Sequence, residues 1–171
     1  KCPSIISRSE WNARRAKTSD ILDVIPPPFV VVHHSEGSEC SNVRSCKSQV
    51  KGIQNFHMNS NGWKDIAYNF LIGGDGSVYE GRGWEGFGIH CPKYNGNSIG
   101  ICLLGNFMNK LPPTKQLDAL KDLIACAKEK NYIASDYKLI GHRQGKSTDC
   151  PGDELFKEIK KWPHFDSSIR I

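Results

Sequence analysis

The feature that most constrains the fold of this chain is its alternation of short apolar runs with longer amphipathic segments. A β-branched run at residues 29–33 follows three prolines and is typical of a buried strand. Residues 43–59 repeat apolar positions at helical spacing, which predicts an amphipathic helix. Strands that alternate with helices are typical of α/β domains. The sequence therefore predicts a central mixed, mostly parallel β-sheet flanked by about three helices.

The remaining elements follow from periodicity and turn residues. We expect strands at residues 67–72, 77–79, 98–104 and 138–140, and helices that begin at Thr114 and Asp153. The glycine-rich stretch 73–76 predicts a hairpin between the first two of these strands. The strand at 98–104 is apolar on both faces and is expected near the centre of the sheet. Thr114 is expected to cap its helix.

The 171 residues suit one structural domain. Residues 1–27 are expected to form an irregular N-terminal segment that packs on the body through Trp11, and residues 28–171 to form the domain proper. No apolar run approaches the length of a membrane span. We expect a monomer, with a dimer as the alternative.

The chain carries a net charge of +5, which would favour anionic partners such as bacterial walls, although an ordinary soluble surface is the simpler explanation of the charge. The sequence has no run of five or more basic residues, which argues against a nucleic-acid partner.

Seven cysteines are many for this length and favour an oxidising compartment, so we expect a secreted, extracellular protein. Cys40 and Cys46 could close a short loop, and the odd count leaves at least one thiol for another purpose. The sequence contains no C-x-x-C pair, which argues against a zinc cluster built from several cysteines.

Three residues suited to zinc lie at or just after predicted strand ends: His33, His142 and Cys150. A catalytic zinc uses three protein ligands of this kind and leaves a fourth position for water. Two histidines and a cysteine also occur by chance. His34 must point away from its neighbour in a strand, and alternation alone does not say which of the two faces the site.

Two further side chains near predicted strand ends could take part in chemistry. Tyr68 could donate a hydrogen bond to a developing oxyanion, or could be an ordinary rim tyrosine. Thr148 could orient a ligand or a bound carbonyl, or could be a plain loop threonine.

Motifs over most of the chain resemble those of the peptidoglycan recognition proteins, which are relatives of phage-lysozyme-type amidases. The matching stretches, in order, are Ser9–Trp11, Val31–Ser35, Asn55–Met58, Gly62–Gly73, Val78–Trp84, Ser98–Ile101, Gly105–Phe107, Gly141–Gln144 and Cys150–Gly152. So many matches in the right order are specific. The resemblance implies the fold of that family and a bacterial peptidoglycan, or a muropeptide derived from it, as partner.

The family divides into zinc amidases and binding-only members, which typically lose the cysteine ligand. This chain keeps all three positions, so the resemblance implies Zn²⁺ on His33, His142 and Cys150 and an N-acetylmuramoyl-L-alanine amidase of innate immunity. It also implies catalytic roles for Tyr68 and for Thr148, its companion. The alternatives are a receptor or bactericidal protein that binds without cutting, and a thiol hydrolase with Cys150 as nucleophile.

The resemblance also implies the groove residues Gly62, Trp63, Arg82, His57 and His90. Gly62-Trp63 together with Arg82 resembles members that prefer the diaminopimelate type of wall, because an arginine can pair with the extra carboxylate.

The resemblance also implies two disulfides, Cys2–Cys126 and Cys40–Cys46. Cys91 and Cys102 depart from the family pattern, and could pair with each other or stay as buried thiols.

Overall fold

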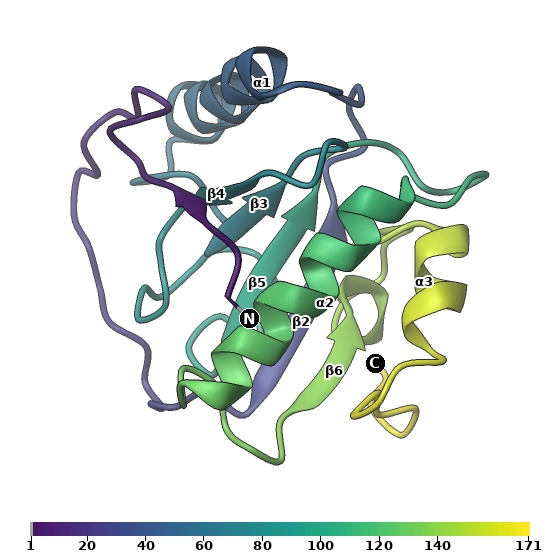
Figure 1. Ribbon diagram of the computed structural model, residues 1–171. Helices are drawn as coiled ribbons and strands as arrows, with labels where there is room; N and C mark the ends of the chain where they lie inside the picture. The colour runs from purple at the N-terminus through teal and green to yellow at the C-terminus, as the bar shows by residue number, and fades with distance from the viewer. Residues whose placement is uncertain (1) are drawn as a thin grey trace.

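The chain folds around one six-stranded sheet, shown in the computed structural model of Figure 1, which describes residues 2–171. The strand order is β1-β4-β3-β5-β2-β6. Their bounds are Ile5–Ile6 (β1), Phe29–His34 (β2), Phe70–Ile72 (β3), Val78–Glu80 (β4), Ser98–Leu103 (β5) and Lys138–Gly141 (β6). Only the β3–β4 pair is antiparallel among the named pairs of residues 2–171. The predicted mixed, mostly parallel sheet is therefore confirmed.

Helices cover both faces of this sheet. In Figure 1, α2 (Thr114–Glu129) crosses the near face with α3 (Asp153–Ile159) beside it, and α1 (Val43–Asn55) lies at the top. The residues of α2 and α3 share one apolar cluster with Val30 and Val32 of β2. The buried side of α1 packs with Leu71 of β3 in a second cluster. The predicted three-helix α/β architecture is confirmed.

The central strands are apolar on both faces because both faces are covered. Along β2, Val30 and Val32 face α2, whereas Val31 and His33 face the opposite layer. All of β5 is buried, and it pairs with β2 on one side and β3 on the other. The carboxyl ends of the parallel strands β2, β5 and β6 therefore meet at one edge, where loops can gather side chains.

Several details differ from the prediction. α1 ends at Asn55, and residues Phe56–Ser60 form one turn of π-helix. β3 begins at Phe70, because the carbonyls of Ala67 and Tyr68 accept from the loop amides of Ile89 and Arg82. Thr114 is the first helical residue, and the cap is Pro113, which offers no side-chain oxygen. The two-residue strand β1 was not predicted, because so short a segment shows no alternation.

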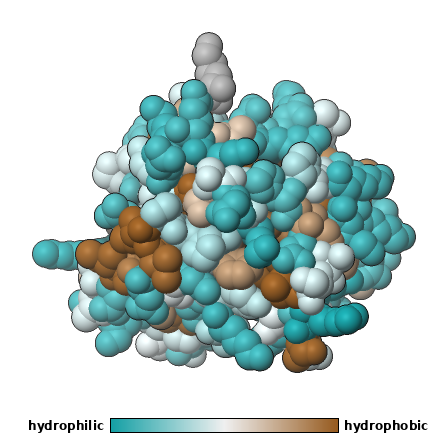
Figure 2. Space-filling view, turned by 90° about the horizontal axis from the view of Figure 1, so that it is seen from below, coloured by the Kyte–Doolittle hydropathy of each residue, from teal (hydrophilic) through white to brown (hydrophobic). Residues whose placement is uncertain are grey.

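The N-terminal segment is tied to the body at several points. β1 adds to the edge of the sheet beside β4, and Trp11 is 2% exposed with its indole N–H on the carbonyl of Glu80. Later in the segment, Ile21, Val24 and Ile25 are exposed. Figure 2 shows the face below Figure 1, where brown apolar groups stand among mostly hydrophilic side chains. The boundary at residue 27 stays a prediction.

The cysteines fall into two groups. Disulfides join Cys2 to Cys126 and Cys40 to Cys46. The first spans 124 residues, and a loop of that size is worth about 5 kcal/mol in the chain-entropy model. Cys91 and Cys102 are free buried thiols, so of the two alternatives the structure has the buried thiols and not a third disulfide. They belong to different apolar clusters, Cys91 beside Val31 and Cys102 among the residues that α1 covers.

Candidate metal centre

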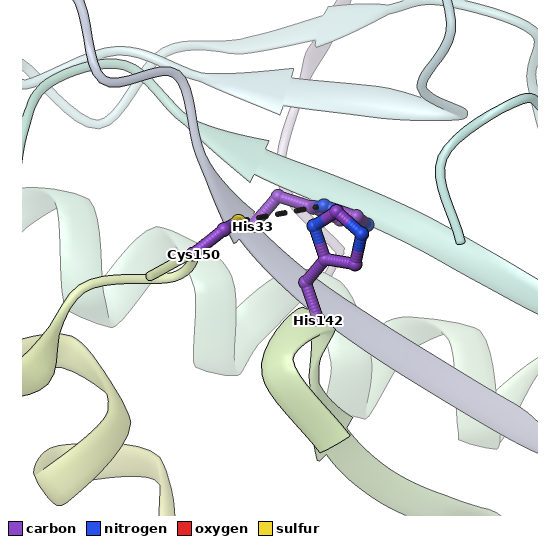
Figure 3. A group of neighbouring side chains, drawn as sticks. All are labelled: His33, His142 and Cys150. Atoms are coloured by element: carbon purple, nitrogen blue, oxygen red, sulfur yellow. Dashed lines mark hydrogen bonds between the residues drawn. The ribbon is translucent and has the colours of Figure 1, made fainter. Parts of the chain in front are cut away.

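Three side chains converge at the carboxyl edge of the sheet (Figure 3). His33 comes from the end of β2, and His142 opens the 3₁₀ turn that follows β6. Cys150 comes from the loop before α3. One ligand atom of each lies within 4.8 Å of the other two, and in residues 2–171 no other group of three metal-binding side chains is as close. The three side chains that the sequence predicted as zinc ligands therefore lie together in the structure.

Local hydrogen bonds hold the Cys150 loop in place. The hydroxyl of Thr148 accepts the amide N–H of Cys150 at 3.2 Å. The amide of His34 donates to Cys150 Sγ at 3.4 Å, which orients the thiol toward β2. Gly152 then has φ +97°, and a Cβ there would lie 2.4 Å from the carbonyl carbon of Phe107. A side chain at residue 152 would therefore push this loop away from the sheet.

The geometry of the group fits a zinc ion. Cys150 Sγ lies 3.6 Å from His33 Nδ1 (dashed in Figure 3), and a tetrahedral zinc requires about 3.6 Å between a sulfur and a nitrogen ligand. Both ring nitrogens of His142 are buried without a hydrogen-bond partner, which is costly unless something else binds them. Two imidazoles and a thiolate are the ligand types that zinc prefers.

The electrostatics of the three side chains argue against a free thiolate nucleophile. Burial raises the pKa of the Cys150 thiol to about 12. Burial also lowers the pKa of His142 to about 4, and lowers the pKa of His33 well below its ordinary value. A reactive cysteine needs a lowered pKa and a base in contact. His142, the base in the thiol-hydrolase alternative, makes no hydrogen bond to Cys150. The ring beside the thiol is His33, whose Nδ1 lies 3.6 Å from Cys150 Sγ and whose pKa is lowered well below its ordinary value by burial.

The structure settles the ambiguity between the two neighbouring histidines. His33 joins the group, and His34 points to the other side of the strand. His34 Nδ1 accepts the amide of Phe107 at 3.1 Å, and its Nε2 lies 3.4 Å from the carboxylate of Glu36. His34 is therefore engaged in local structure.

Two cavities flank the group, and His57 and Tyr68 line both. One, of 390 Å³, extends over the start of the loop after β2 and along α1. The other, of 230 Å³, lies toward Trp63, His90 and His142. Together they form a groove that passes the candidate metal centre. Lys146 also lines the second cavity, although the sequence did not predict a role for it. The one sequence feature that could have indicated it is its position between the candidate ligands His142 and Cys150.

His57 presents a hydrogen-bond donor to this groove, which Tyr68 also lines. His57 sits in the π turn, and its Nδ1 accepts the amide of Ala67 at 3.0 Å, so Nε2 carries the proton. Burial raises the pKa of Tyr68 well above its ordinary value, which keeps the phenol protonated. The Tyr68 ring lies 5.1 Å from the ring of His33. A donor in this place can serve a carbonyl held beside the metal centre.

Two predicted groove residues lie away from these cavities. Arg82 lines a separate cavity of 270 Å³ with Arg8 and Asp65, where its guanidinium donates to the carbonyls of Ile66 and Phe87 at 2.7 Å. Gly62 is exposed with φ +71° and precedes Trp63, which lines the second groove cavity. The roles of both residues in binding stay predictions.

Comparison with known proteins identifies the family of this chain. The model of the N-acetylmuramoyl-L-alanine amidase family matches residues 23–153. Peptidoglycan-recognition protein LB of Drosophila melanogaster is 47% identical over 162 residues, which is 94% of this chain and 69% of that protein. The chain belongs to the peptidoglycan recognition protein family. Peptidoglycan recognition protein 1 of Bos taurus is 45% identical over 165 residues, covering 96% of this chain and 86% of the relative.

A solved structure of the same family shows the same fold. Peptidoglycan recognition protein LE, in complex with tracheal cytotoxin, matches with a TM-score of 0.93 at 41% identity, covering 95% of each chain. The ligand in that structure is monomeric diaminopimelic acid-type peptidoglycan. The chain described here carries the His33–His142–Cys150 group on that shared fold. In residues 2–171 no helix is long and apolar enough to span a bilayer.

The buried histidines predict acid sensitivity of the metal-free protein. Burial lowers the pKa of His57 to about 4 and that of His90 to about 3, from 6.5. Between pH 6.5 and these values the unfolded chain binds protons that the folded chain does not. The free energy of unfolding therefore falls as the pH is lowered. From pH 7 to pH 5 each histidine should cost about 1–2 kcal/mol of unfolding free energy. Urea titrations of metal-free protein at both pH values measure this.

A His57→Gln variant provides the control for this prediction. Glutamine cannot be protonated, so the variant should lose less stability than the native protein over the same pH interval. Unchanged or higher stability of the native protein at pH 5 would contradict the burial of neutral imidazoles.

Proposed function

We propose that this protein is a zinc-dependent N-acetylmuramoyl-L-alanine amidase that binds bacterial peptidoglycan and hydrolyses the amide between the lactyl group and L-alanine. The observation that carries the proposal is the group of His33, His142 and Cys150, with both nitrogens of His142 unpaired. The family match supports it, because the matched family is described by this activity. Recognition proteins of the same family need no such group, so the complete ligand set favours catalysis over binding alone.

His33 Nδ1, a ring nitrogen of His142 and Cys150 Sγ would hold the zinc. When bound, zinc would lower the pKa of a water and polarise a carbonyl. Cys150 would serve as a ligand and not as the nucleophile, because a metal keeps a coordinating thiol deprotonated. Thr148 would keep the ligand loop in register through its bond to the amide of Cys150.

The other residues of the groove would bind and orient the substrate. Tyr68 would donate its phenol proton in a hydrogen bond to the oxyanion that develops on the scissile carbonyl. His57 would donate from Nε2 to the glycan or peptide, since Nδ1 is occupied by Ala67. Trp63 and His90 would line the peptide side of the groove. The two flanking cavities suit an extended substrate that runs past the metal centre.

We also propose that the protein acts outside the cell, in innate immunity. The two disulfides suit an oxidising compartment. The net charge of +5 would attract anionic bacterial walls through long-range electrostatics.

Release of stem peptide from diaminopimelate-type peptidoglycan tests the amidase directly. We expect release with added Zn²⁺, none after chelation, and recovery when Zn²⁺ is restored. Release that a chelator does not stop would favour thiol chemistry. Wall binding without release in any condition would make the protein a recognition protein.

We predict that this protein prefers diaminopimelate-type over lysine-type wall through Arg82. A guanidinium can pair bidentately with the extra carboxylate, and hydrogen bonds to charged groups are worth about 1.5–3 kcal/mol. Arg82→Ala should therefore reduce the ratio of the two affinities by about 10–100-fold. The ratio is the right measurement, because Arg82 also bonds to two backbone carbonyls and its loss would weaken both complexes.

Arg15→Ala is the matched control for Arg82. Arg15 lines the same cavity and is exposed, so its loss removes the same charge from the same region. We expect it to leave the ratio within about twofold, as for a screened surface charge. Equal affinity of the native protein for both wall types would rule out the preference.

A further inference from the structure

The ring of His33 makes a second contact on the side away from the metal centre. Its Nε2 lies 2.9 Å from Nδ1 of His90, with the two rings nearly perpendicular and their centroids 5.0 Å apart. His33 is 1% exposed and His90 is 6% exposed. A hydrogen bond between two buried imidazoles requires that one ring donates and the other accepts.

The direction of this bond follows from the far end of a chain of hydrogen bonds. The carbonyl of Tyr94 can only accept, so the hydroxyl of Ser98 must donate to it. Ser98 Oγ then accepts from His90 Nε2, at 3.2 Å. A neutral His90 with its proton on Nε2 has an acceptor at Nδ1, so His33 must donate from Nε2. His33 Nδ1 is left unprotonated, and this is the nitrogen that faces Cys150.

The fold holds His90 in the position that this chain requires. A Cβ on Gly100, the β5 residue paired with Val31, would lie 2.6 Å from the His90 ring. The ring therefore occupies space that only a glycine leaves open. Asn95 Oδ1 accepts the amides of both His90 and Cys91 at 2.8 Å, which fixes the backbone of the loop. Ser98 is fully buried at the start of β5.

We infer that His90 is a positioning residue for the metal ligand His33. Ser98 sets the direction of the hydrogen bond between the two rings, because its hydroxyl oxygen accepts a hydrogen bond from His90 Nε2. The inference rests on the proposed zinc site. His90 fixes the tautomer of His33 that presents Nδ1 to the metal, and it also fixes the angle of the ring. Metal-binding histidines commonly need such a partner, and losing it typically costs about 10–100-fold in metal affinity.

Two variants of His90 separate positioning from packing. His90→Phe fills the same space and removes the acceptor, whereas His90→Asn places a carbonyl oxygen near the former Nδ1 and can still accept from His33. In competition with a chromogenic chelator, we expect His90→Phe to bind Zn²⁺ about 10–100-fold more weakly than the native protein. We expect His90→Asn to stay within a few-fold. His164→Phe, which replaces a histidine that stacks on Tyr137, is the control and should keep native affinity.

The tautomer of His33 can be read without any metal. Long-range ¹H–¹⁵N correlation spectra of the metal-free protein should show His33 protonated at Nε2 in the native protein. The spectra of His90→Phe should show a mixture of both tautomers. Native protein with His33 protonated at Nδ1 would overturn the inference, whatever happens to folding of the variants.

The affinity and tautomer measurements also separate this inference from the zinc proposal. Native affinity for Zn²⁺ in His90→Phe, or equal losses in the Phe and Asn variants with an unchanged tautomer, would likewise overturn the role of His90. Native protein that binds no Zn²⁺ would sink the proposed function instead, while the spectra would still decide the hydrogen-bond direction.

Discussion

Replacing Cys150 by serine is expected to remove zinc and to lower amidase activity by about 10³-fold or more. A serine hydroxyl stays protonated at neutral pH and is a poor zinc ligand, although it fits the same space. A bound metal supplies several kcal/mol of transition-state stabilisation, and each 1.36 kcal/mol is a factor of ten in rate. Zinc content of the purified variant and stem-peptide release measure the two effects. Binding to insoluble peptidoglycan should persist.

The same substitution at Cys91 is the matched control for Cys150. Cys91 is also a free buried thiol, but it lies outside the metal group, so Cys91→Ser should keep its zinc. Loss of activity in Cys150→Ser would not by itself separate a ligand from a nucleophile. The zinc content does, because a nucleophile could be lost without loss of metal. Full activity in a Cys150→Ser variant that holds no zinc would contradict the proposal.

The convergence of His33 and His142 could be predicted because it depends on strand ends. His33 and His142 follow apolar runs that could only be buried strands, and parallel strands end at the same edge. The burial of β5 was predictable for the same reason, since a strand without a polar face needs cover on both sides. These inferences use local patterns and one rule of sheet architecture.

Other features depend on contacts that no local pattern encodes. Alternation could not choose between His33 and His34, because the choice depends on which layer holds the loops after β6. The resemblance assigns Arg82 to the extra carboxylate of the bacterial wall, but no local pattern predicts that its guanidinium also bonds to the carbonyls of Ile66 and Phe87. The role inferred for His90 depends on Ser98 and Gly100, whose spacing in the sequence carries no recognisable signal.

The pairing of the cysteines shows the same limit. The count of seven could accommodate a third disulfide, but Cys91 and Cys102 pack in separate clusters. A count of thiols says nothing of their positions, and a disulfide requires a specific short separation of its two Cα atoms.

Tyr68→Phe is expected to lower kcat for stem-peptide release by about 10²–10³-fold while it leaves zinc binding unchanged. The variant keeps the ring that packs 5.1 Å from His33 and loses only the hydroxyl. Removing one preorganised donor to an oxyanion typically costs this much, because the bond strengthens as charge develops. KM should change little, since the same bond contributes less to the bound substrate than to the transition state.

A second tyrosine supplies the control for the loss of the hydroxyl. Tyr132 stacks on Trp84 just beyond the end of α2, and Tyr132→Phe should keep native kcat. The pH dependence gives a second test of this role. Because burial holds the pKa of Tyr68 far above neutrality, the phenol stays a hydrogen-bond donor across the pH range in which the fold is stable. Activity should therefore show no rise between pH 7 and pH 9 that disappears in Tyr68→Phe. Such a rise would mean that the phenol ionises and that Tyr68 acts as a base, which would assign it a different role at the carbonyl.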